Sequence, residues 1–165
     1  MKKIALLLCV VSPMLMGQEV TFGLSIEIPR HNVSEYHAPY IATWVENEHR
    51  QAVESTSLWY DDQLKWLKDI RQWWRKTGRS QTEPFDGITG ATRRPGTHKL
   101  LLEPISVTND WPAGNYQLMV EAAREVGGRE VVSLPFEWPV TTDQVIEAVG
   151  NQELGKITLN LTVTQ

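Results

Sequence analysis

The stretch VTFGLSIEIP at residues 20–29 alternates apolar and polar side chains with a period of two. The apolar residues that fall on one face are Phe22, Leu24, Ile26 and Ile28. This alternation is typical of a β-strand with one buried face. The same pattern predicts strands at Tyr40–Glu46 and Val53–Tyr60, and the polar connection 47–51 between them has the length of a hairpin loop.

Four segments further along the chain also have the strand pattern. They are His98–Val107, Tyr116–Ala122, Glu130–Glu137 with a break or bend at Pro135, and Ile157–Val163. Residues 126–129 contain two glycines and predict a tight hairpin turn. Seven short strands separated by turns indicate an all-β fold, an immunoglobulin-like antiparallel β-sandwich, in which Tyr116 resembles the tyrosine that pins a corner. A partly open barrel is the alternative architecture.

A helical pattern interrupts the strands before residue 78. The apolar residues with helical spacing are Leu64, Leu67, Ile70 and the pair Trp73 and Trp74. We expect one Trp-rich helix that begins at Asp61 or Asp62, ends at Gly78 in the left-handed conformation, and carries its basic residues in the last turn. Leu67, Ile70 and one of the two tryptophans are expected to pack on the sandwich. The following connection, 78–97, is predicted to be a long loop.

The first 17 residues have the features of a secretory signal peptide. Lys2 and Lys3 precede a short apolar run at residues 4–11, and Gly17 is a plausible cleavage site. The run is too short to span a bilayer. We therefore expect a periplasmic or secreted β-sandwich domain of residues 18–165. Cleavage would remove Cys9, the only cysteine, which excludes disulfides, cysteine-held zinc and iron–sulfur clusters from the mature chain.

Charge and motifs exclude several function classes. The chain has 16 basic and 20 acidic residues, and loss of Lys2 and Lys3 leaves 14 basic residues and a net charge of −6. Such an acidic domain is not expected to bind nucleic acid by neutralising phosphates. The histidines lack the i, i+4 spacing of a metal site, and no Gly-x-Ser-x-Gly motif occurs. We expect neither a metal site nor enzymatic activity.

The segment Asp86-Gly87-Ile88-Thr89-Gly90-Ala91-Thr92, within the long connection, is the candidate functional motif. A threonine on such a Gly-rich loop is accessible, and the guanidinium groups of Arg93 and Arg94 can hold a phosphate. Phosphoryl transfer also needs a metal and a base, and neither is evident in this chain, so another enzyme would modify Thr92. Alternatively, the segment is an ordinary connection in which Asp86 caps a turn.

This segment resembles the acceptor motif of bacterial flavin transferases, Asp-Gly/Ala-x-Ser/Thr-Gly/Ser-Ala-Thr, whose last threonine is esterified by the phosphate of FMN. The matching positions are Asp86, Gly87, Thr89, Gly90, Ala91 and Thr92. The resemblance implies covalent FMN on Thr92, a flavin transferase as partner, and electron exchange with a membrane-bound redox partner. The aromatic residues whose faces suit a flavin ring are Trp59, Tyr60, Trp66, Trp73 and Trp74, although aromatic residues at helical spacing are more often core.

The chain as a whole resembles a family of small secreted bacterial proteins, domain of unknown function 2271. The segments that carry the resemblance are Tyr36–Glu46, Leu58–Tyr60, the Trp-rich helix through Arg75, Asp86–Pro95, Pro112–Tyr116 and Glu121–Glu130. The resemblance implies export and frequent genomic company with membrane proteins and flavin transferases. Two functions remain open: an accessory electron-transfer protein with FMN on Thr92, or a flavin-free module that docks on a membrane complex through its Trp-rich helix and loop.

Overall fold

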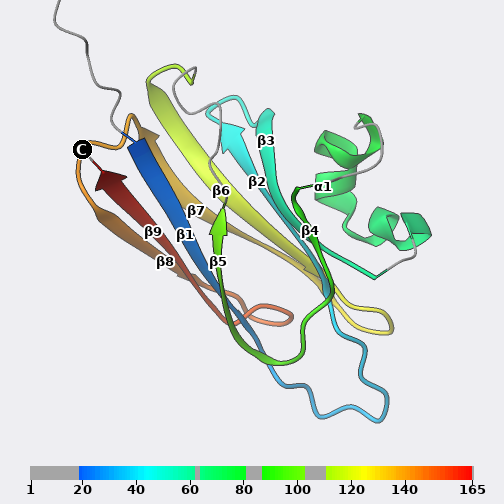
Figure 1. Cartoon of the computed structure of the whole chain (residues 1–165). Helices are drawn as coiled ribbons and strands as arrows, with labels where there is room; N and C mark the ends of the chain where they lie inside the picture. Colours follow the sequence, from blue (N-terminus) through cyan, green and yellow to red (C-terminus); the bar gives the residue numbers. More distant parts are fainter. Residues whose placement is uncertain (1–18, 62–63, 81–86, 103–110, 165) are drawn as a thin grey trace, which may run out of the picture.

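The computed structural model describes residues 19–61, 64–80, 87–102 and 111–164. The strands are β1 (Glu19–Ile28), β2 (Tyr40–Asn47), β3 (Ala52–Trp59), β4 (Thr89–Gly90), β5 (Gly96–Leu102), β6 (Gly114–Ala123), β7 (Arg129–Trp138), β8 (Gln144–Val149) and β9 (Lys156–Thr164). They form two sheets, of order β5-β1-β9-β8 and β4-β3-β2-β6-β7 (Figure 1). The predicted signal peptide, Asp62, Asp86 and residues 103–107 lie outside the described residues.

The two sheets pack face to face around one apolar core. Alternate residues of β1, among them Phe22, Leu24 and Ile26, are buried against inward-facing residues of the other sheet such as Val45 and Leu118. Every strand pair is antiparallel except β3 with β4, and no pairing among the described strands joins the two sheets. The prediction of an all-β antiparallel sandwich is confirmed.

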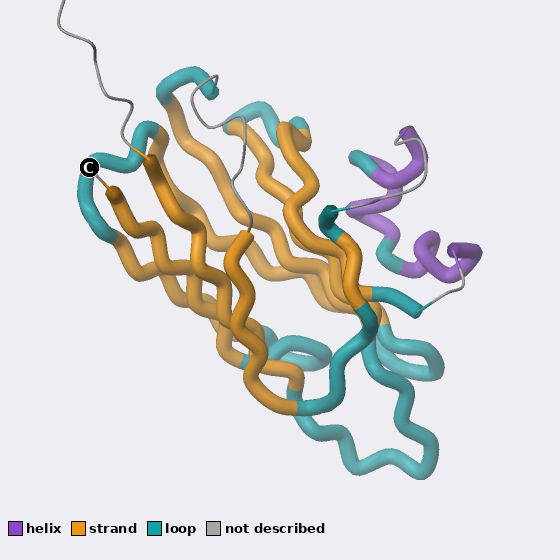
Figure 2. Tube along the Cα trace, in the orientation of Figure 1, coloured by secondary structure: helices purple, strands orange, loops and turns teal. Residues whose placement is uncertain are grey.

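The outer face of the five-stranded sheet carries the helical layer, which lies beside the strands in Figure 2. Leu67, Ile70 and Trp73 are buried there against residues of β2 and β6, as predicted. A fully buried aliphatic side chain such as Ile70 stabilises the fold by about 2 kcal/mol. No helix in the described part of the chain has the length and apolar character needed to cross a membrane.

The one predicted Trp-rich α-helix is present among the described residues, but it is shorter than predicted, because the layer consists of three short pieces. They are the 3₁₀ helix η1 (Leu64–Asp69), α1 (Arg71–Lys76) and the 3₁₀ helix η2 (Gly78–Ser80). Ile70 precedes α1 and supplies no side-chain cap. Gly78 starts η2 with no left-handed backbone, and a Cβ there would lie 2.6 Å from the Trp73 ring. Gly78 is therefore needed for close packing on the tryptophan, not to end a helix.

Two predictions outside the helical layer also need correction, one for a strand and one for a loop. β7 runs unbroken through Pro135, which is tolerated because β7 is an edge strand and one side of its backbone needs no ladder partner. The connection 78–97, predicted to be a loop, contains η2 and β4. The hairpin turn between β6 and β7 is confirmed, but its positive φ falls on Val126 and not on either glycine.

The corner predicted at Tyr116 is present. Its hydroxyl donates a hydrogen bond to the carbonyl oxygen of Pro112 at 2.8 Å. The Tyr116 ring stacks on Trp111, with 5.0 Å between centroids. This contact fixes the start of β6 against the end of the preceding connection, a structural role of the kind found in other sandwiches.

Candidate functional site

The candidate motif runs along the free edge of β3. Gly87 has a φ of +90°, which glycine adopts without steric cost, and it turns the chain toward the sheet. The carbonyl of Ile88 accepts a hydrogen bond from Leu58 N at 2.7 Å, and that of Gly90 accepts one from Tyr60 N at 2.9 Å. The two residues of β4 thereby form a short parallel pair with β3. The motif is therefore tied to the five-stranded sheet on both sides of Thr89.

Thr92 lies half-buried just after this tie. The next residue, Arg93, places its guanidinium carbon 4.5 Å from the ring centroid of Trp59. The backbone carbonyl of Arg94 accepts a hydrogen bond from Nε2 of His98 on β5, at 2.8 Å. Thr92 therefore lies between two fixed points of the chain. One is the set of hydrogen bonds that hold Ile88 and Gly90 on β3, and the other is the hydrogen bond from His98 of β5 to the Arg94 carbonyl. Arg93 and Arg94 are both exposed, but only Arg93 has its guanidinium group over the Trp59 ring.

A cavity of about 350 Å³ opens beside the motif. It lies between β3, with its short partner β4, and the edge strand β5 of the other sheet (Figure 1). Its volume falls in the lower range of small-molecule sites. Residues that line it include Glu54, Ser57, Trp59, Thr89, Arg93 and Leu100. Gly87 and Gly90 also line it, so the structure brings three of the predicted motif residues to one hollow.

Glu54 faces the space between the sheets because β3 contains a bulge. Ser57 pairs with Thr43, but the next pair joins Trp44 to Ser55, so Thr56 is the extra residue. Cross-strand partners share a face of the sheet. Ser55 therefore joins Trp44 on the outer face, and Glu54 joins Val45 on the inner face.

The Glu54 carboxyl group is only partly satisfied. Its Oε2 atom is buried and has no hydrogen-bond partner. Burial raises the pKa of Glu54 above its ordinary value, because the charged form loses hydration without gaining a donor. The sequence analysis missed Glu54, since strict alternation along β3 would have placed Ser55 inside. Only the bulge reveals it, and no residue in the segment marks a bulge.

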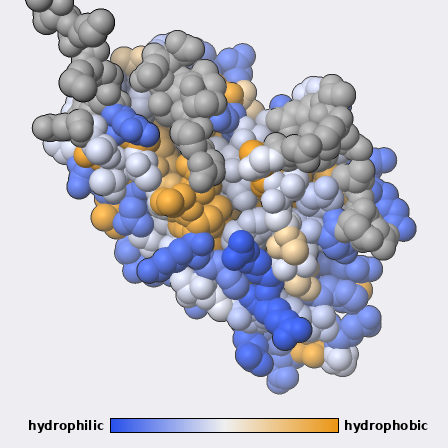
Figure 3. All heavy atoms as spheres, viewed as in Figure 1, coloured by the Kyte–Doolittle hydropathy of each residue, from blue (hydrophilic) through white to orange (hydrophobic). Residues whose placement is uncertain are grey.

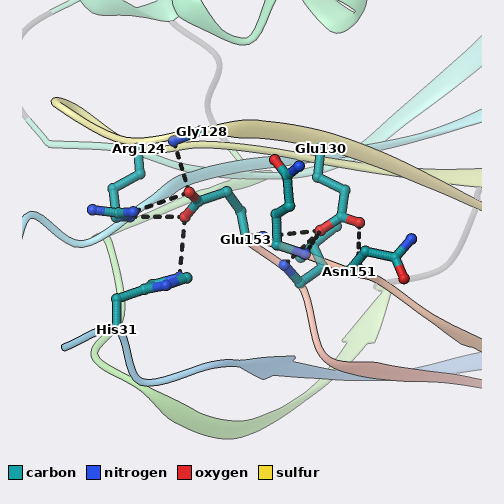
Figure 4. Close-up of polar contacts among 8 residues, drawn as sticks. His31, Arg124, Gly128, Glu130, Asn151 and Glu153 are labelled. Carbon is teal, nitrogen blue, oxygen red and sulfur yellow. Dashed lines mark hydrogen bonds and ion pairs between the residues drawn. The ribbon is translucent and has the colours of Figure 1, made fainter. Parts of the chain in front are cut away.

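A second polar cluster closes one end of the sandwich and has a different character (Figure 4). The Glu153 carboxylate accepts hydrogen bonds from Nε and Nη2 of Arg124 at 2.8 and 3.1 Å, and from Gly128 N at 2.7 Å. The Glu130 carboxylate accepts hydrogen bonds from four consecutive backbone N–H groups, residues 151–154. These carboxylates connect the β6–β7 hairpin to the β8–β9 loop, and we assign them a structural role.

The donors lower the pKa of both carboxylates in this second cluster. Burial raises the pKa of Glu130, but its four backbone donors outweigh burial and bring the pKa below its ordinary value. Burial likewise opposes ionisation of Glu153, and the Arg124 hydrogen bond, the Gly128 N–H and the charges of Arg124 and His31 outweigh it. Glu54, without such donors, shifts in the opposite direction.

The aromatic residues proposed for stacking separate into two groups. Trp59 lines the cavity and is 3% exposed. Tyr60, Trp66, Trp73 and Trp74 pack in the cluster under the helical layer, on the outer face of the sheet. Trp59 is therefore the aromatic candidate that shares a hollow with the motif. Among the described residues, no group of three or more His, Cys, Asp or Glu side chains is arranged to hold a metal ion.

The model of the family described as predicted periplasmic protein (DUF2271) matches residues 21–156, which is most of the chain. No curated protein matches the chain, and no solved structure matches it either.

Proposed function

The chain belongs to DUF2271, a family of predicted periplasmic proteins, and from this premise we propose that it is a periplasmic electron-transfer protein with FMN covalently attached to Thr92. The observation that carries the proposal is the acceptor-like motif 86–92, whose described part lies along the free edge of β3 beside a cavity. The attachment is a phosphoester between the Thr92 hydroxyl oxygen and the FMN phosphate, made by a flavin transferase from a flavin dinucleotide. The Thr92 O–P bond forms as the phosphoanhydride bond of the dinucleotide breaks, AMP leaves, and a base of the transferase takes the hydroxyl proton.

The residues around Thr92 suit such a cofactor. Thr92 is followed directly by Arg93, whose guanidinium group is stacked on Trp59. Arg93 and Trp59 both line a cavity of ligand size, and Thr92 adjoins that lining through the chain. FMN supplies one- and two-electron redox chemistry when it is bound. The chain holds and shields the flavin, turns over no substrate of its own, and exchanges electrons with a membrane-bound redox partner.

The attachment is tested by co-expressing the exported protein with a flavin transferase and measuring intact mass. We expect the wild-type mass to rise by one FMN less one water. Thr92→Ala is expected to abolish the increase, because the nucleophilic oxygen is lost, while stability changes by within about 0.5 kcal/mol. Thr92→Ser keeps the hydroxyl and is expected to retain part of the modification. Asp86→Ala is expected to lower it, since the transferase would read the whole motif.

Thr97→Ala is the matched control, because Thr97 is an exposed threonine on β5 outside the motif. This variant is expected to be modified as fully as the wild type. An unmodified wild-type mass, from cells in which a known acceptor protein is fully flavinylated, would reject the proposal. The flavin-free module that docks on a membrane complex would then be the remaining function.

A further inference from the structure

We infer that the cavity between β3 and β5 receives the isoalloxazine ring of the flavin on Thr92, with the ring against Arg93 and the Glu54 carboxyl group at its polar end. The inference rests on the proposed function, because the covalent bond is what brings the ring to this cavity. It adds the location of the ring and two residues, Arg93 and Glu54, that contact it.

Chain connectivity favours this location. Gly90 and Arg93 both line the cavity, and Thr92 lies between them in the sequence. Hydrogen bonds from β3 hold the motif at Ile88 and Gly90, so the border of the cavity is fixed close to the attachment point. A group attached to Thr92 therefore starts at the mouth of the hollow.

Arg93 and Trp59 provide a flat surface for a planar ring. The Trp59 ring is held in place from one edge by His98, with 5.9 Å between centroids and nearly perpendicular planes. The Arg93 guanidinium group lies over this ring. A guanidinium group is itself planar and stacks on aromatic systems. Arg93 can therefore stack between the indole and the flavin ring.

The two sides of the cavity match the two ends of isoalloxazine, which has an apolar dimethylbenzene end and a pyrimidine end with N–H and carbonyl groups. Leu100 and Leu101 of β5 line one side, and Figure 3 shows apolar surface over β5, where Leu101 is 66% exposed. Glu54 and its neighbours on β3 line the other side.

The buried Glu54 Oε2 atom lacks a donor within the protein. Nearly all buried polar atoms in folded proteins have a hydrogen-bond partner, so an unpartnered oxygen on a residue that lines a cavity indicates a ligand donor. An N–H group of the pyrimidine ring would supply that donor.

The experiment measures the exposure of attached flavin by iodide quenching of its fluorescence, after intact mass has confirmed attachment. We expect the quenching constant to be several-fold lower than for free FMN. Arg93→Ala is expected to raise it toward the free value. Arg94→Ala is the matched control, because Arg94 is the adjacent exposed arginine and does not line the cavity. Both variants should still carry FMN.

Glu54→Gln provides a second, independent test. Removing the carboxyl group from the polar end of the ring is expected to shift the visible absorption bands of the attached flavin. Glu147→Gln on β8 removes a carboxylate far from the cavity, at the opposite edge of the same sheet as β5, and is expected to leave the bands unchanged.

The outcomes separate the two claims. Attached flavin that iodide quenches as readily as free FMN would overturn the ring location and leave the proposed function intact. The ring location would also be overturned if Arg93→Ala and Arg94→Ala changed the quenching constant equally and Glu54→Gln left the absorption bands unchanged. An unmodified mass would remove the proposed function and, with it, the inference.

Discussion

The two faces of the five-stranded sheet each carry a glutamate with a buried carboxyl oxygen, and the surroundings of these two oxygens differ. Glu121 of β6 faces the helical layer and is fully buried. It accepts hydrogen bonds from the backbone N–H groups of Gln72 and Trp73 and from Nη1 of Arg129, all between 2.7 and 3.1 Å. Glu54 of β3 faces the gap between the sheets, and its Oε2 atom has no partner.

The difference shows how to separate carboxylates that build the fold from one that is available to a ligand. Glu121 satisfies the first backbone donors of α1, which has no side-chain cap of its own, and so attaches the helical layer to the sheet. Glu130 and Glu153 likewise satisfy backbone donors of loops. The Oε2 atom of Glu54 accepts no such bond from the described part of the chain. Burial without a partner is costly, and a functional contact explains why this cost is retained.

The largest effect in this comparison is expected from Glu121→Ala. The substitution leaves two backbone N–H groups at the start of α1 without an acceptor and removes the partner of Arg129, at a cost of about 3 kcal/mol. Urea denaturation measures the free energy of unfolding. Glu137→Ala, at an exposed position on β7, is the control and should change it by less than about 0.5 kcal/mol. Similar losses in both variants would show that Glu121 does not anchor the layer.

Glu121 also shows why only part of the molecule could be predicted from the sequence. Half-buried strands such as β1 were predictable because alternation is a local property of the chain. The acceptor at the start of α1 comes from a residue 49 positions away, so local spacing predicted one helix with a cap at Asp61 or Asp62. Asp61 instead accepts a hydrogen bond from the Tyr40 hydroxyl. The start of α1 therefore depends on the distant contact with Glu121, which local spacing cannot reveal.

Two further features could not be predicted from the sequence, one for a local reason and one for a tertiary reason. In β8, Val145 and Val149 are exposed while Ile146 and Ala148 are half-buried, so apolar residues on both faces conceal the alternation. At the candidate site, the motif was visible as residue types, but its cavity was not. The cavity requires the bulge in β3 that turns Glu54 inward and the approach of β5 from the other sheet, which are both tertiary features.

An intermediate effect is expected from Glu130→Gln. The donors that lower the pKa of Glu130 stabilise the folded state above its ordinary pKa, and this contribution is lost as pH falls through the lower, folded-state value. Gln keeps one acceptor oxygen but loses the charge, so we expect a loss of about 1 kcal/mol at pH 7. The loss should shrink as pH falls below the ordinary glutamate pKa of about 4.3, because the unfolded chain then binds a proton that the folded carboxylate resists. Denaturation at several pH values measures this convergence, and a loss that stayed constant down to pH 3 would contradict it.

The smallest effect, and the one with the opposite sign, is expected from Glu54→Gln in the protein without flavin. Because burial raises the pKa of Glu54, folding favours its protonated form, and this contribution to stability is lost as pH rises from the ordinary value through the folded-state pKa. At pH 7 the charged carboxylate therefore opposes folding, and the neutral amide should stabilise the protein by less than about 1 kcal/mol. Below about pH 4, where Glu54 is neutral in both states, wild type and variant should be equally stable.

This last measurement distinguishes Glu54 from the structural carboxylates directly. Glu130→Gln lowers stability at neutral pH and Glu54→Gln raises it, although both changes remove one negative charge from an acidic protein. The general relief of charge repulsion acts in the same direction in both variants, so it cannot produce opposite signs. A destabilised Glu54→Gln protein at pH 7 would show that the carboxylate has a stabilising partner in the fold. Glu54 would then belong with Glu121 and Glu130, and the case for a ligand at this carboxyl group would fail.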